Sequence, residues 1–218
     1  MTQAHPDGYL ALPPTGRGPG VLVLHAWWGL NETIKAFCTR LADAGFVAFA
    51  PDLYHGKLAN TIPEAEALAK ALSKNYLQAK AETVDAAAFL SERATQANHG
   101  LAVIGFSLGA SYALDLAAAA PEYVRSVVIF YGTGGGDFSS SRADYLGHFA
   151  EDDDFEPTAY VNELEEALQG DGRSVTFYHY PGIGHWFFEP DRTDAYDQAA
   201  ADLAWERTLA FLRSSTAA

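Results

Sequence analysis

Short apolar runs alternate with longer amphipathic stretches along the chain. Apolar and polar residues do not alternate within these runs, as they would in a strand with one solvent-exposed face. Continuous apolar runs of this kind are typical of strands buried on both faces of a sheet. We predict six such strands, over residues 21–25, 46–50, 101–105, 124–131, 145–149 and 175–180.

The stretches between these runs carry apolar residues at helical spacing. Asn31 is suited to cap a helix, and Thr61 with Glu64 has the spacing of a capping box. Pro121 prevents the helix before it from continuing. We predict helices over residues 31–45, 76–97, 158–168 and 195–212. Two further helices are predicted, one that begins at residue 61 and one that follows the third strand and ends near residue 120.

Strands that alternate with helices favour an α/β fold, with a mostly parallel sheet covered by helices on both faces. In such sheets ligands bind outside the carboxyl ends of the strands, so the loops after the predicted strands are where we expect the chemistry. The chain contains neither an internal repeat nor a low-complexity linker, and residues 1–218 are therefore predicted to form one domain.

Composition narrows the class of protein. Hydrophobic residues make up 49% of the chain and charged residues 19%, which excludes a disordered or collagen-like protein. The formal net charge of −14 disfavours nucleic acid and anionic membranes as partners. Cys38 is the only cysteine, so an intrachain disulfide is excluded. With no run of 18 apolar residues and no leader-like N-terminus, we expect a cytoplasmic protein that needs no cofactor.

A serine between glycines follows the third predicted strand. Residues 105–109 read Gly-Phe-Ser-Leu-Gly, which is the pattern of a nucleophile elbow between a strand and a helix. Such a turn lifts the hydroxyl of Ser107 clear of the backbone, and the next helix points its positive end at the same place. We therefore predict that Ser107 is a nucleophile; the simpler interpretation is a turn serine.

A nucleophilic serine needs a base within hydrogen-bond reach. His185 stands in a glycine-flanked loop after the last predicted strand, which fits the chain order serine, acid, histidine. Five other histidines have simpler interpretations: solvated side chains for His5 and His99, packed or hydrogen-bonded side chains for His148 and His179, and a loop-shaping role for His25.

The acid that orients this base must lie between Ser107 and His185. Residues 151–157 follow the fifth predicted strand and are rich in carboxylates. Chemistry alone leaves open which residue acts, among Asp152, Asp153 and Asp154. A solvated acidic loop and a calcium site are the alternatives, but the spacing of a calcium loop is absent, and we predict no metal.

Negative charge that develops on the substrate needs backbone donors aimed at it. One donor is the N–H of Leu108, the residue after the nucleophile, and the second comes from the loop after an early strand. That loop covers residues 25–29, and the N–H of Trp27 is its natural candidate.

Several segments together resemble the dienelactone hydrolase family of α/β-hydrolases, from residue 7 to residue 211. The most specific are the Ala-Pro-Asp-Leu-Tyr string and the acid loop, at residues 50–54 and 153–157. Further matches lie at residues 12–13, 24–31, 104–109 and 181–185. The resemblance implies the α/β-hydrolase fold and an enzyme that hydrolyses carboxylic esters or lactones.

The resemblance also implies roles for particular residues. The family's triad aspartate lies four residues before the proline of the acid loop, which is Asp153 in this chain, with Asp154 second. Relatives use cysteine where Ser107 stands and glutamate where Ala26 stands, so this chain is similar to a serine version of the family. The oxyanion donors carry over to Trp27 and Leu108.

Relatives also carry an arginine shortly after the histidine, which binds a substrate carboxylate. Here the stretch reads Trp-Phe-Phe-Glu at residues 186–189, which predicts apolar surface followed by a negative charge, with Arg192 as a partial substitute. We therefore expect small, neutral or aromatic substrates. The predicted pocket is mainly apolar and is formed by Trp28, Tyr54, Phe106 and Trp186.

Three alternatives stay open. An amidase, thioesterase or short-peptide hydrolase has the same fold, because one fold hosts many chemistries. A non-catalytic binding protein that retains the fold is a second alternative. The third is a phosphate cradle at residues 132–137, although the glycine spacing is not that of a dinucleotide-binding loop.

Overall fold

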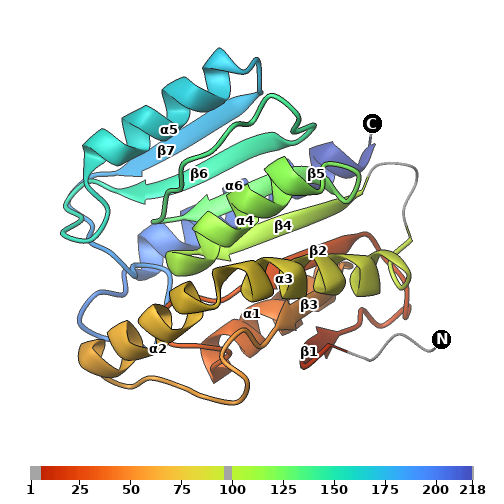
Figure 1. The fold of residues 1–218 in the computed structure, drawn as a ribbon, viewed down its shortest axis with the longest axis horizontal. Coiled ribbons are helices and arrows are strands. Elements are labelled where there is room, and N and C mark those ends of the chain that lie inside the picture. The colour runs from red at the N-terminus through yellow and green to blue at the C-terminus, as the bar shows by residue number, and fades with distance from the viewer. Residues whose placement is uncertain (1–5, 96–99, 218) are drawn as a thin grey trace.

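The computed structural model describes residues 6–95 and 100–217. Within these residues, seven strands form one sheet in the order β1-β3-β2-β4-β5-β6-β7, in which β1 is antiparallel to β3 and all other neighbours are parallel (Figure 1). The strands are β1 Gly8–Ala11, β2 Gly20–Leu24, β3 Val47–Pro51, β4 Leu101–Phe106, β5 Val124–Phe130, β6 Asp144–Ala150 and β7 Val175–Tyr180.

Six helices accompany the strands in the part of the chain that the structure describes: α1 Glu32–Asp43, α2 Ile62–Lys74, α3 Tyr76–Ser91, α4 Leu108–Ala119, α5 Thr158–Gly170 and α6 Gln198–Ala217. Helices α1 and α6 cover one face of the sheet, and α3, α4 and α5 cover the other (Figure 1). Each face buries its own hydrophobic cluster. The predicted mostly parallel sheet between two helical layers is confirmed.

Local sequence signals account for several helix ends. The side chain of Asn31 accepts a hydrogen bond from the N–H of Ile34 at 3.0 Å, as expected of a helix cap. Thr61 and Glu64 form the predicted capping box, in which each side chain accepts from the other residue's backbone. Gly45 has a φ of 101° just beyond α1, a conformation that favours glycine.

Three elements differ from the predictions. Strand β1 was not predicted from the sequence, because this four-residue antiparallel edge strand lacks a continuous apolar run. The helix predicted over residues 76–97 ends at Ser91, and residues 96 and 97 of that prediction lie outside the described residues. Strand β7 is an edge strand and is less buried than predicted, since only Tyr180 in it is fully buried.

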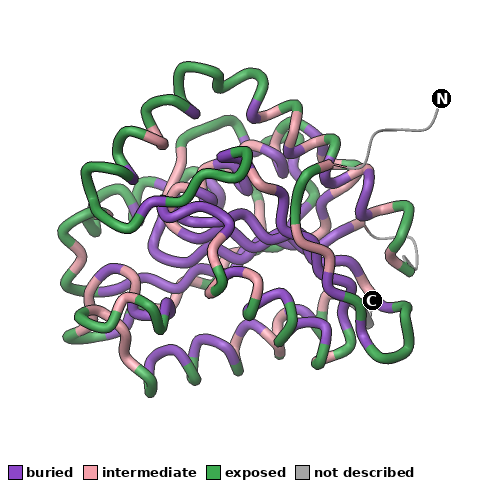
Figure 2. The backbone as a smooth tube through the Cα atoms, turned by 90° about the horizontal axis from the view of Figure 1, so that it is seen from below, coloured by how far each residue is buried: buried purple, intermediate pink, exposed green. Residues whose placement is uncertain are grey.

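The centre of the molecule is formed by buried strand segments, and exposed positions lie on the outer turns of the helices (Figure 2). Because β2 and β4–β7 run parallel, their carboxyl ends lie along one edge of the sheet. The loops that leave this edge include residues 25–31, 131–143, 151–157 and 181–197. Among the described helices, none has both the length and the apolar character to cross a membrane.

Candidate active site

Ser107 occupies a sharp turn between β4 and α4. Its φ of 48° and ψ of −112° place it in a strained conformation for a residue with a side chain. A Cβ atom at Gly105 would lie 2.5 Å from the Gly109 carbonyl oxygen, and one at Gly109 would lie 2.2 Å from the Leu24 carbonyl oxygen. The turn therefore requires glycine on both sides of the serine, which is the physical basis of the motif.

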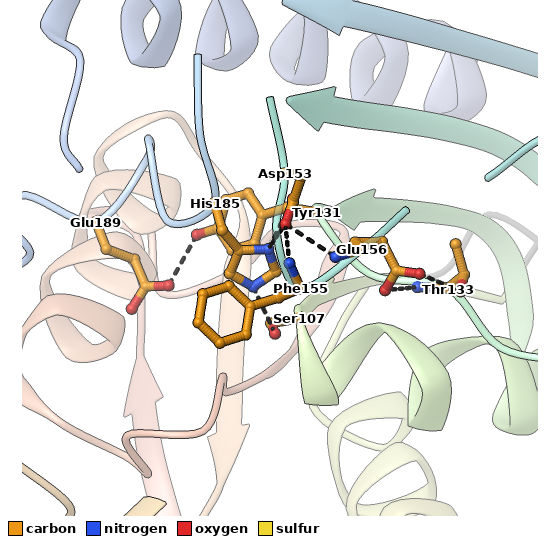
Figure 3. Close-up of polar contacts among 8 residues, drawn as sticks. All are labelled: Ser107, Tyr131, Thr133, Asp153, Phe155, Glu156, His185 and Glu189. Atoms are coloured by element: carbon orange, nitrogen blue, oxygen red, sulfur yellow. Dashed lines mark hydrogen bonds and ion pairs between the residues drawn. The ribbon is translucent and has the colours of Figure 1, made fainter. Parts of the chain in front are cut away.

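A line of hydrogen bonds runs from this serine to the acidic loop (Figure 3). The Oγ of Ser107 lies 2.9 Å from Nε2 of His185. Nδ1 of the same imidazole lies 2.9 and 2.7 Å from the two carboxylate oxygens of Asp153. A carboxylate accepts hydrogen bonds, so Nδ1–H donates and Nε2 is free to accept the serine proton.

The acidic loop holds the carboxylate of Asp153 in place. Oδ1 accepts hydrogen bonds from the backbone N–H groups of Phe155 and Glu156, each at 2.9 Å. The Asp153 side chain is only 3% exposed, whereas Asp152 and Asp154 are both exposed. Of the three aspartates that the sequence left open, the structure brings Asp153 to His185.

Aromatic side chains surround His185, whose side chain is 4% exposed. The ring of Tyr131 lies 4.9 Å from the imidazole between centroids, and that of Phe155 lies 5.2 Å from it. Phe155 is 43% exposed and also contacts Trp186 at 4.7 Å and Trp27 at 5.9 Å. Sequence reasoning missed Phe155; its position inside the acidic loop, two residues after Asp153, was the available signal.

Tyr131 is itself held by a carboxyl group. Its hydroxyl donates to Oε1 of Glu189 at 2.9 Å (Figure 3). Burial raises the pKa of Glu189 to about 8, which favours the protonated, neutral form of this side chain at neutral pH. The sequence predicted a negative charge facing the substrate at this position. That prediction is wrong, because the carboxyl group is 1% exposed and folded inward.

A second pair connects the segment after β5 with the acidic loop. The carboxyl oxygens of Glu156 accept from the N–H of Thr133 at 3.0 Å and from its hydroxyl at 2.7 Å. Burial raises the pKa of Glu156. The glycine-rich residues 132–137 therefore support the acidic loop and are not followed by a helix, which contradicts the phosphate-cradle alternative.

The two predicted oxyanion donors lie on segments that the structure packs together. Leu108 is the first residue of α4, directly after Ser107. The close approach of Gly109 to the carbonyl oxygens of Leu24 and His25 places the end of β2 against the elbow. Trp27 lies two residues further along that loop. His25 holds the loop through Nδ1, which donates to the Ala26 carbonyl oxygen at 2.8 Å.

The predicted pocket residues are divided by the structure. Trp28, Tyr54 and Phe106 are buried, and Trp186 is partly exposed. Phe106 packs in the core against Phe37, at 5.1 Å between ring centroids. Phe106 also lines a cavity together with Phe188 and Glu189. Beside His185 lie the rings of Phe155 and Trp186, and the ring of Trp27 packs against Phe155.

Other titratable candidates have structural explanations. His148 is buried between the hydroxyls of Tyr180 and Thr208, and burial lowers the pKa of His148 to about 3. His179 is exposed on one side, and its ring stacks on that of Phe149 at 6.0 Å between centroids. Burial raises the pKa of Cys38 to about 12, so its thiol is unreactive. His5 and His99 lie outside the described residues, within which no cluster of three metal-binding side chains occurs.

Comparisons with known proteins agree with this architecture. A model of the dienelactone hydrolase family matches residues 7–216. A protein from Aquifex aeolicus with the provisional name carboxymethylenebutenolidase is 32% identical over 216 residues, which cover 95% of this chain and 92% of that protein. A protein from Bradyrhizobium sp with the provisional name 2-oxo-3-(5-oxofuran-2-ylidene)propanoate lactonase is 33% identical over 220 residues, covering 94% and 88%.

A solved structure gives the same result. The crystal structure of a provisionally named dienelactone hydrolase from Klebsiella pneumoniae subsp. pneumoniae matches with a TM-score of 0.80 at 27% identity, covering 93% of this chain and 90% of that one. The family match spans nearly the whole chain, and the fold agrees with it. This chain therefore belongs to the dienelactone hydrolase family of α/β-hydrolases, a family of enzymes that hydrolyse esters and lactones.

Proposed function

We propose that this protein is a serine hydrolase that cleaves small neutral carboxylic esters or lactones through an acyl-enzyme. The observation that carries the proposal is the unbroken line of hydrogen bonds from Ser107 through His185 to Asp153. A serine on a strained turn, a histidine base and a buried orienting carboxylate are the groups that nucleophilic acyl transfer needs.

The reaction proceeds in two halves. Oγ of Ser107 attacks the carbonyl carbon while its proton passes to Nε2 of His185, which gives a tetrahedral oxyanion. His185 then returns the proton to the leaving alcohol oxygen as the carbon–oxygen bond breaks, and an ester to Ser107 remains. Water repeats the sequence with His185 as the base, releasing the acid and the free serine. In a lactone, the alcohol and the acid belong to one product molecule.

Two further groups support these steps. The carboxylate of Asp153 fixes the imidazole tautomer and stabilises the imidazolium that forms when His185 takes the proton. The backbone N–H groups of Trp27 and Leu108 donate to the oxyanion; such a donor contributes about 10²–10³ in rate.

The surroundings of His185 favour neutral substrates with small or aromatic acyl groups. Phe155 and Trp186 offer apolar surface beside the imidazole, and Trp27 extends this surface next to Phe155. Arg192, the nearby cation that the sequence offered for a carboxylate, pairs with Asp191 at 2.8 Å and lies over the Trp28 ring. A substrate carboxylate would have to displace Asp191 to use that charge, which disfavours anionic lactones.

A fluorophosphonate probe tests the nucleophile directly. We expect covalent labelling of Ser107 at mildly alkaline pH and none in Ser107→Ala. His185→Ala should lower kcat on nitrophenyl acetate by several orders of magnitude while the circular dichroism spectrum stays unchanged. If the folded protein takes no label, or if His185→Ala keeps its activity, the proposal is wrong.

A substrate panel tests the bond that is cleaved. We expect kcat/KM for nitrophenyl esters and neutral lactones to exceed that for matched anilides and thioesters, and a lactone that carries a carboxylate to react more slowly than its neutral methyl ester. Faster cleavage of a thioester or anilide would instead identify one of the other acyl-transfer activities on this fold.

A further inference from the structure

We propose that Tyr131 and Glu189 act as a positioning pair for His185, in which the ring of Tyr131 limits the tilt of the imidazole and the Glu189 carboxyl group fixes that ring. The inference rests on the proposed function, since it concerns the same histidine. In this proposal both residues act on catalysis indirectly, through the orientation of His185.

The ring of Tyr131 is held in a fixed position beside His185. The residue is fully buried at the end of β5, with its ring 4.9 Å from the imidazole and 5.5 Å from the Phe187 ring. Its hydroxyl donates to Glu189 at 2.9 Å, so the ring is held at its far end as well as at the backbone. A side chain packed on two sides and tied at its tip has little freedom to move.

The imidazole of His185 needs a neighbouring ring that restricts its rotation. Its two hydrogen bonds, to Ser107 and to Asp153, leave from the two ring nitrogens and define an axis through the imidazole. Rotation about that axis leaves both nitrogens nearly in place, yet it swings the in-plane lone pair of Nε2 away from the line of proton transfer. A ring that lies against the imidazole restricts this tilt, and misplacement of reacting groups by about 1 Å can cost about 10²-fold in rate.

Glu189 belongs to the same loop as His185 and closes it. Its N–H donates to the Trp186 carbonyl oxygen at 2.9 Å, while its side chain reaches across to Tyr131. The second carboxyl oxygen, Oε2, is buried and has no hydrogen-bond partner among the described residues. Burying a carboxyl group with one oxygen unsatisfied costs stability, and such groups in folded proteins call for an explanation.

Backbone strain is concentrated around this pair. Tyr131 has a φ of 39° and Trp186 a φ of 63°, and both are adjacent in space or sequence to His185. Non-glycine residues keep such conformations only where surrounding contacts impose them, and they cluster at functional sites. The strain and the unsatisfied carboxyl oxygen are two separate costs at one place, which agrees with a role in positioning.

The test compares three variants with a matched control. Tyr131→Phe and Glu189→Leu remove the hydrogen bond and should each lower kcat on nitrophenyl acetate about tenfold, with KM changed less than about twofold. Glu189→Gln keeps an oxygen that can accept from Tyr131, and it should retain kcat within about twofold. Tyr145→Phe removes a similar buried hydroxyl, which contacts Ser141 at 2.7 Å away from the site, and should leave kcat unchanged.

The proton between His185 and Asp153 gives a readout that needs no substrate. We expect its downfield NMR resonance to shift or broaden in Tyr131→Phe and to stay unchanged in Tyr145→Phe. Unchanged kcat and an unchanged resonance in Tyr131→Phe, or a Glu189→Gln variant as impaired as Glu189→Leu, would overturn the inference. Failure of the probe to label Ser107 would overturn the proposed function instead, and the resonance would still test the pair.

Discussion

Asp153 and His185 lie 32 positions apart in the chain, yet their side chains meet at 2.7 Å. Both side chains are almost wholly removed from water, and two backbone N–H groups hold the carboxylate before any substrate binds. Charge stabilisation is stronger where water is excluded, so this carboxylate is well placed to favour an imidazolium during turnover.

Asparagine substitutions in the acidic loop test which aspartate is responsible. Asp153→Asn should lower kcat by about 10²–10⁴, because an amide can hold the imidazole in the wrong tautomer and offers no negative charge. Asp154→Asn is the matched control, since Asp154 is exposed one residue along the same loop. Nitrophenyl ester kinetics measure both, and a larger loss in Asp154→Asn would contradict the assignment.

The close approach of Gly132 to the nucleophile yields a second prediction. A Cβ atom at Gly132 would lie 2.4 Å from the Ser107 carbonyl oxygen and 2.9 Å from its Cα. Gly132→Ala must therefore displace the elbow, and we expect kcat to fall at least about tenfold and stability to fall by about 1–3 kcal/mol. Urea unfolding and steady-state kinetics measure the two effects.

Gly135→Ala is the control for this substitution. Gly135 lies in the same glycine-rich segment, and a Cβ atom there would meet no atom within 4 Å. Its activity should equal that of the unmodified protein, and its stability should change by no more than about 0.5 kcal/mol. Equal behaviour of the two alanine variants would show that contact with the elbow is unimportant.

Much of this arrangement was accessible from the sequence, because it depends on local signals. The six apolar strands, the Asn31 cap and the capping box at Thr61 were all predictable from short-range patterns. The glycines around Ser107 indicated the elbow because a side chain at either position would clash with backbone atoms packed against the turn. Asp153 was singled out only through the resemblance to the family, since three neighbouring aspartates are chemically equivalent until the chain folds.

The features that sequence reasoning missed depend on long-range contacts. Nothing near Glu189 in the chain indicates that its carboxyl group turns inward toward Tyr131, 58 positions away. Phe106 carried no sign of which sheet face it would occupy, and the structure buries it among core aromatic rings such as Phe37. Strand β1 depends on pairing with β3 for its existence, which a four-residue segment does not reveal.

The buried carboxyl group of Glu189 predicts how stability depends on pH. In the unfolded chain this group ionises near pH 4.5, whereas burial raises the pKa of Glu189 to about 8 in the folded protein. Between these values the folded state holds a proton that the unfolded state has lost, so stability falls as pH rises. The slope from this group approaches about 1.4 kcal/mol per pH unit.

Glu189→Gln isolates this contribution, because an amide does not titrate. We expect urea unfolding to show that the unmodified protein loses about 2 kcal/mol more than the variant between pH 5.5 and 7.5. The neighbours that act on the group, Tyr131, Asp191 and Arg192, are present in both proteins. Parallel stability curves over this range would mean that Glu189 is already ionised in the folded protein.

Phe155 provides the last prediction, which concerns the choice of substrate. Its exposed ring lies against both His185 and Trp186, and we expect an acyl group attached to Ser107 to contact it there. An aromatic contact of this kind is worth about 0.5–1.5 kcal/mol, or about twofold to twelvefold in kcat/KM. Phe155→Ala should therefore lower kcat/KM for nitrophenyl benzoate relative to nitrophenyl acetate by that factor.

Using the ratio of the two kcat/KM values removes any general effect of the substitution on His185. Tyr160→Ala changes an exposed aromatic residue on α5, and as the control it should leave the ratio unchanged. An unchanged ratio in Phe155→Ala would show that the acyl group binds elsewhere along the loop edge.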